Sequence, residues 1–218
     1  MAFTRGAIRK IDRQRGGGSH LPSLDEFGNL TVSQWMPAYS RLASAGRLFI
    51  ADTHAGDGKV CVTAMPTTSP EWGLYNASPS QTLVLLQVAC SIKSTGATGL
   101  GLALVAAAAK GPQTAVTSSY SSNGSAVINC CNGSQRAPDV FITNNPTLVG
   151  GTPAWHVWDA TEVNTVATDS VGDGLVANIQ GALIARPRGM VAWEIVGEPG
   201  AGADTLFSVS AIFVMLDL

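Results

Sequence analysis

The chain has three histidines, the side chains best suited to general acid–base chemistry near neutral pH. His54 lies in a Gly/Asp-rich segment close to Asp52 and Asp57, which could orient it as a base. A hydrolase built on such a pair also needs a nucleophile, and no Gly-x-Ser-x-Gly or comparable motif is present. His20 falls in a Gly-rich linker and His156 in a strand-like run. We therefore expect no catalytic residues and no enzymatic activity.

Two pairs of aspartates could supply some, but not all, of the oxygen ligands of a calcium-binding loop. Asp52 and Asp57 form one pair, and Asp169 and Asp173 form the other. A dedicated calcium loop places oxygen ligands at alternate positions, and neither segment does so. Each aspartate pair ends in an Asp-Gly sequence, which is typical of a turn. We expect no metal and no cofactor.

The four cysteines also lack the spacing of a metal site. Cys61 and Cys90 lie in apolar runs of strand length and are predicted to be small core residues. Cys130 and Cys131 are neighbours, whose side chains would leave a strand on opposite faces, so a shared zinc is disfavoured. A disulfide involving them stays open at this point. Synthesis in a reducing cytoplasm is the default expectation.

Several aromatic residues have two interpretations. Trp72 with Tyr75, or Trp155 with Trp158, would suit a sugar-binding platform, whereas the alternative is that these rings anchor the core or an interface. They are not interleaved with basic residues, which argues against a platform for single-stranded nucleic acid.

Basic residues are concentrated at the start of the chain. The first fifteen residues carry five cations and one acid, so this arm has a charge of about +4 and the remainder about −6. A Gly16-Gly17-Gly18 hinge follows, and we assign residues 1–20 to a flexible arm. Five cations are few for packaging a genome, which favours docking on an acidic protein over binding nucleic acid. The cations predicted to bind the partner are Arg5, Arg9, Lys10, Arg13 and Arg15.

The composition of the chain predicts an oligomer. Only 13% of the 218 residues are charged, whereas 45% are hydrophobic, and subunit contacts are the simplest way to cover such a surface. The longest apolar run, 97–109, contains two glycines and is too short to span a bilayer, so we expect no membrane association.

The pattern of apolar runs predicts an all-β fold. Residues 21–46 read as a connector with a possible short helix within 33–45, ended by Gly46. Residues 47–218 read as an antiparallel β-sandwich of the jelly-roll kind, because short apolar runs alternate with Gly, Pro and Asn turns. The predicted strands are 48–51, 59–64, 82–91, 100–107, 125–131, 140–143, 154–158, 175–185, 190–196 and 206–216.

The last strand carries the most detailed prediction. One face is apolar throughout and is expected to pack on the core, while the other face turns apolar halfway along. We expect the later half of that second face to be covered by a sheet edge or by another subunit. The core face comprises Phe207, Val209, Ala211, Phe213 and Met215.

With the arm, hinge, charge-poor β body and final strand, the chain resembles structural proteins of tailed-bacteriophage particles. The segment 65–76, the strand 82–91 that follows it and the ending 206–218 carry the resemblance. Such proteins are similar to capsid cement (decoration) proteins and short head or tail spikes, which are often trimers of β-sandwiches. The resemblance implies a homotrimer, made in the host cytoplasm and located in the virion, that docks on the major capsid protein or other virion proteins through its arm. It provides no catalytic residue.

Two other functions remain open from the sequence. The same body could be the single jelly-roll coat protein of a small virus, with the arm facing the genome. Alternatively, the aromatic residues could make it a glycan-binding adhesin module.

Overall fold

The computed structural model describes residues 39–53, 59–94, 100–114, 127–131, 139–163, 174–197 and 206–217. The chain divides into two units, Met1–Arg41 and Leu42–Leu218. Only the last residues of the first unit are described, so the predicted arm and most of the connector lie outside the described residues. Within the described ranges, no helix is long and apolar enough to cross a membrane.

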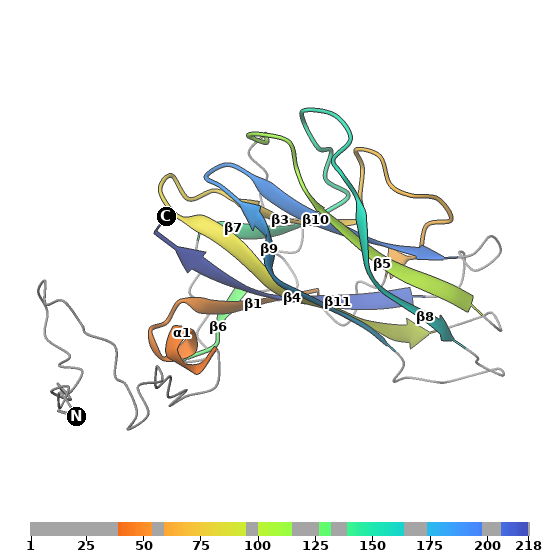
Figure 1. Ribbon diagram of the computed structural model, residues 1–218, viewed down its shortest axis with the longest axis horizontal. Helices are drawn as coiled ribbons and strands as arrows, with labels where there is room; N and C mark the ends of the chain where they lie inside the picture. The colour runs from red at the N-terminus through yellow and green to blue at the C-terminus, as the bar shows by residue number, and fades with distance from the viewer. Residues whose placement is uncertain are drawn as a thin grey trace, which may run out of the picture. The chain divides into compact units, whose positions relative to one another are not determined.

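Among its described residues, the second unit is mostly β-strand with one short helix, and the strands form two antiparallel sheets (Figure 1). One sheet has the order β6-β1-β11-β4-β9, with β2 added to β11, and the other has the order β7-β3-β10-β5-β8. The elements are α1 (Ser40–Ser44), β1 (Leu48–Asp52), β2 (Lys59–Val60), β3 (Trp72–Asn76), β4 (Thr82–Ser94), β5 (Leu100–Ala108), β6 (Val127–Asn129), β7 (Val140–Asn144), β8 (His156–Val163), β9 (Gly174–Ala185), β10 (Met190–Gly197) and β11 (Leu206–Leu216).

The strand pairing is that of a jelly roll. β1 pairs with β11, β3 with β10, β4 with β9 and β5 with β8, so the first strand pairs with the last and each later pair nests inside. These eight strands form two four-stranded sheets, β1-β11-β4-β9 and β3-β10-β5-β8, as in a double-sheet jelly roll. The predicted antiparallel β-sandwich is confirmed.

The core lies between the two sheets and follows the period-two alternation of the strands. Along β9 exposed and buried residues alternate from Gly174 to Gln180, and the inward side chains join one apolar cluster. The predicted core face of β11 belongs to this cluster, and Phe213 stacks on Phe49 at a centroid distance of 5.6 Å. Burying a side chain of this size stabilises the fold by about 1.5–3 kcal/mol.

The short helix α1 explains why the other face of β11 turns apolar. Leu42 and Ala43 pack against a second cluster of Leu48, Leu86 and Val214. The later half of this face is therefore covered, as predicted, but the cover includes residues of α1, whereas the sequence predicted a sheet edge or another subunit. Gly46 ends the helix, also as predicted: its φ is +68°, and the N–H groups of residues 46 and 47 donate to the carbonyls of residues 43 and 42.

One strand is absent from the sequence prediction. β3 is buried at all five positions, so it has no polar alternation to mark it as a strand. The predicted strand 59–64 is shorter, since β2 ends at Val60 and Val62 makes only an isolated bridge to Val196. The predicted strand 154–158 begins later and runs further, as β8 from His156 to Val163.

Candidate functional site

The five arm cations lie outside the described residues, as do His20, His54, Asp57, Asp169 and Asp173. His156 is exposed at the start of β8, and Asp52 is exposed at the end of β1. Among the described side chains, no three His, Cys, Asp or Glu residues gather closely enough to hold a metal ion. All four cysteines are free, and the predicted core positions Cys61 and Cys90 are buried.

The sugar-binding interpretation of Trp72 and Tyr75 is wrong for this fold. Trp72 is 0% exposed and Tyr75 only 3%, so neither ring offers a face to a ligand. The two residues lie on opposite faces of β3: Trp72 packs between the sheets and Tyr75 packs with Met190 on the outer side. Both rings are core residues.

Trp155 and Trp158 are half-buried and are held by hydrogen bonds to the backbone. The indole Nε1 of Trp155 donates to the carbonyl of Thr67 at 3.1 Å, and that of Trp158 donates to the carbonyl of Ala106 at 3.3 Å. Trp155 therefore holds the segment at Thr67 to the residues just before β8, and Trp158 holds β5 to β8. This arrangement supports their interpretation as anchors.

The outer face of the larger sheet is the most distinctive surface of the β body. Along β9, β11 and residues 82–91 of β4, no outward position carries an ionisable side chain. Gln87 donates to Asn178 at 2.8 Å and Ser91 bonds Ser208 at 3.1 Å, so the polar groups on this face pair across strands. We call it the uncharged face: Val84, Gln87, Ala89, Ser91, Val176, Asn178, Gln180, Ile184, Ser208, Ser210 and Ile212.

Apolar side chains on the uncharged face remain open to solvent. Val176 is 48% exposed, Ile184 is 39% exposed, and Ile50 on neighbouring β1 is 36% exposed. The exposed Asp52 of β1 pairs with Ser210 and borders this face, whereas the adjoining stretch of β4, β9 and β11 carries exposed apolar residues and no ionisable side chain. Such a stretch is typical of a surface that is covered by another protein.

A buried acidic group lies on the other sheet. Glu194 on β10 is fully buried, and its carboxylate accepts the N–H of Glu71 at 2.7 Å and that of Ile195 at 3.0 Å. Burial raises the pKa of Glu194 to about 8, although these two hydrogen bonds lower it. The Nζ of Lys59 lies 3.5 Å from the carboxylate of Glu71, so the cluster consists of Glu194, Glu71 and Lys59. A single acid within the apolar run MVAWEIVG was the sequence signal for this group.

Three loops meet at one end of the sandwich, around Gln113. We call this the entry end, since β1 begins there: the register places the starts of β1 and β4 beside the ends of β11 and β9. The side chain of Gln113 donates to the carbonyls of Gly111 and Val149 and accepts the N–H of Val149 at 2.7 Å. Its backbone N–H donates to the carbonyl of Arg188 at 2.7 Å.

Comparison with known proteins finds no protein-family model that matches this chain and no curated protein that is similar to it.

Proposed function

We propose that the protein is a non-enzymatic structural component of a virus particle, in which copies associate through the β body and dock on other virion proteins through the basic arm. The observation that carries the proposal is the uncharged face, which leaves Val176 and Ile184 open to solvent. Covering apolar surface contributes about 25 cal/mol per Å², before the cost of association is subtracted.

The jelly-roll topology supports the same class of function. Jelly rolls serve as capsid and lectin domains among other uses, so the fold is compatible with a shell or decoration role without specifying it. The buried positions of Trp72 and Tyr75 weaken the lectin alternative. A homotrimer of the cement or spike kind remains our proposal for the assembly, from the sequence resemblance.

The assembly half of the proposal is tested by measuring the mass of the protein in solution. Val176→Asp places a charge on β9, the edge strand of the uncharged face, and we expect it to convert the oligomer to monomers in sedimentation velocity. Val157→Asp is the matched control, because Val157 is more exposed, at 59%, and lies on β8 of the other sheet. A wild-type protein that stays monomeric at high concentration would refute this half.

The proposed docking through the basic arm is tested with virus particles that lack this protein. We expect the full chain to bind such particles, and a chain with its five arm cations replaced by glutamine to keep its oligomeric mass but bind weakly. Undiminished binding by the neutralised chain would show that the arm does not dock.

A second candidate, the coat protein of a small virus, is supported by the nested pairing of the eight jelly-roll strands, a fold that viral capsid domains share with other classes. Expression of the protein alone would then give closed shells in electron micrographs, with nucleic acid released by salt. A small oligomer without shells favours the decoration or spike role.

A further inference from the structure

Three cations at the entry end have no carboxylate partner among the described residues. Of the described basic side chains, Arg47 pairs with Asp217 at 3.3 Å and Lys59 pairs with Glu71 at 3.5 Å. The remaining cations are Lys110, Arg186 and Arg188, all of them exposed.

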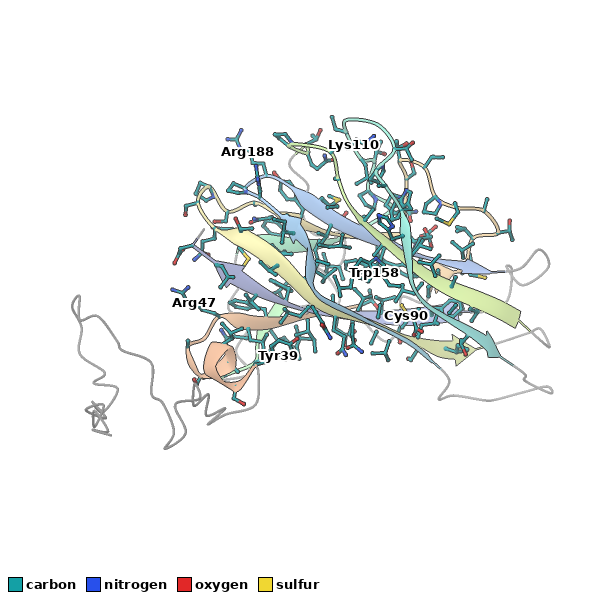
Figure 2. All side chains as sticks on the ribbon, viewed as in Figure 1. Tyr39, Arg47, Cys90, Lys110, Trp158 and Arg188 are labelled. Atoms are coloured by element: carbon teal, nitrogen blue, oxygen red, sulfur yellow. The ribbon has the colours of Figure 1, made fainter. Side chains whose placement is uncertain are left out.

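These cations come from two loops that the fold joins. Lys110 follows β5, whereas Arg186 and Arg188 lie in the turn from β9 to β10, and Figure 2 shows Lys110 and Arg188 at the same end of the molecule. Gln113 connects the loops, because its backbone bonds the carbonyl of Arg188 and its side chain bonds the carbonyl of Gly111, next to Lys110. The backbone at Lys110 and Arg188 is therefore held by a part-buried hydrogen-bond network.

Arg188 occupies a backbone position at which glycine is favoured. The N–H of Gly189 donates to the carbonyl of Arg186 at 2.7 Å, which closes a four-residue turn with Pro187 second and Arg188 third. The φ of Arg188 is +61°. A turn with proline second and positive φ third is of type II, whose third position prefers glycine. An arginine that is kept there despite the strain points to a role for its side chain.

We propose that Lys110, Arg186 and Arg188 form a docking surface on the body for an acidic patch of another protein. This inference rests on the proposed function and adds a body surface to the arm. Ion pairs from two arginines and a lysine would be strengthened where a partner excludes water.

Val149 favours a protein partner over nucleic acid. Its backbone bonds Gln113 on both sides, the next residue, Gly150, lies against Lys110, and Val149 is 47% exposed. An exposed apolar residue close to a lysine has the composition of a protein interface. A phosphate backbone would gain little from this valine.

The test uses the full chain with its five arm cations replaced by glutamine, so that binding through the arm does not mask the body. The probes are immobilised poly-L-glutamate, a single-stranded oligonucleotide of equal charge, and particles lacking the protein. In this background we expect Lys110→Ala, Arg186→Ala and Arg188→Gly together to weaken poly-glutamate binding about tenfold. Lys93→Ala on β4, at the opposite end of the strands, is the control and should change nothing.

Two further variants separate docking from folding and from nucleic-acid binding. Arg188→Gly alone should unfold at the wild-type temperature or above, because it relieves the turn, and yet bind more weakly. Val149→Ser should weaken particle binding several-fold while leaving poly-glutamate binding unchanged.

Equal poly-glutamate binding with and without the three cations would overturn the inference, even if the protein docks on particles through its arm. An oligonucleotide that binds this surface more tightly than poly-glutamate would overturn it in favour of nucleic acid. The wild-type chain could also fail to bind particles while its poly-glutamate binding still depends on the three cations. That result would instead overturn the docking function and the particle partner.

Discussion

The carboxylate of Glu194 accepts the backbone N–H of Glu71 at 2.7 Å, so a buried acid on β10 holds the residue that precedes β3. Two backbone hydrogen bonds join the same region, because Val62 donates to the carbonyl of Ile195 and Gly197 donates to the carbonyl of Val62. The segment that crosses from β2 to β3 is thus fixed to β10 at both ends. An acid at this position makes the attachment sensitive to pH.

The first prediction concerns Glu194 and stability. Its pKa is raised from 4.5 to about 8 by burial, so the folded protein holds a proton that the unfolded chain releases. The free energy of unfolding should therefore fall as the pH rises from about 4.5 to about 8, by on the order of a few kcal/mol, and level off above that. Denaturant unfolding at a series of pH values measures this slope.

Glu194→Gln should remove most of that slope, because an amide is neutral, although its single oxygen can accept only one of the two N–H groups of Glu71 and Ile195. Asp139→Asn, an exposed acid, is the control and should leave the slope as it is. Identical slopes in the Glu194→Gln variant and the wild type would contradict the assignment.

The second prediction concerns the core contact between Phe213 and Phe49. Phe213 is fully buried and stacks on Phe49, so Phe213→Ala should destabilise the protein by about 3–5 kcal/mol in denaturant unfolding. Its neighbour Ile212 points to the other face and is partly exposed, so Ile212→Ala should cost clearly less. Similar losses from the two variants would show that the sheets do not pack as described.

Most strands could be predicted from the sequence because their burial alternates. The exception, β3, shows where the argument fails. Trp72 and Tyr75 flank the Gly73-Leu74 pair, and the sequence leaves both a sugar platform and a core or interface anchor open for these rings. A Cβ at Gly73 would meet the Sδ of Met190 at 2.8 Å, so that glycine leaves room for a neighbouring side chain, which only the tertiary structure reveals.

The candidate surfaces were less predictable than the strands. Lys110 and Arg188 are far apart in sequence, and the pairing of β5 with β10 is what brings their loops together. The uncharged face likewise needs the order of β4, β9 and β11, although the low charge of the whole chain predicted that some surface would need cover.

The third prediction concerns the cysteines. Cys131 is exposed, whereas burial raises the pKa of the Cys61, Cys90 and Cys130 thiols and so disfavours their reactive thiolates. A thiol reagent at pH 8 should label Cys131 first and Cys130 more slowly. Cys61 and Cys90 should react only when the protein unfolds, and mass spectrometry of the peptides would show the order. Rapid labelling of Cys90 in folded protein would contradict the core.

The last prediction concerns Gln113, whose amide group holds the 145–155 segment to the residues after β5. Gln113→Ala removes bonds to Gly111 and Val149 and leaves the part-buried N–H of Val149 without its acceptor, which should cost about 1–3 kcal/mol. Gln87→Ala removes a single exposed bond to Asn178 and should stay within about 0.5 kcal/mol of wild type. Gln113→Ala keeps the backbone bond to the carbonyl of Arg188 and removes the side-chain bonds to Val149, so it should loosen the loop around Val149 before the sandwich unfolds, seen as faster amide exchange at Val149 with the exchange of β11 unchanged. If amide exchange became equally faster at Val149 and in β11, Gln113 would support the whole fold and would not act locally on these loops.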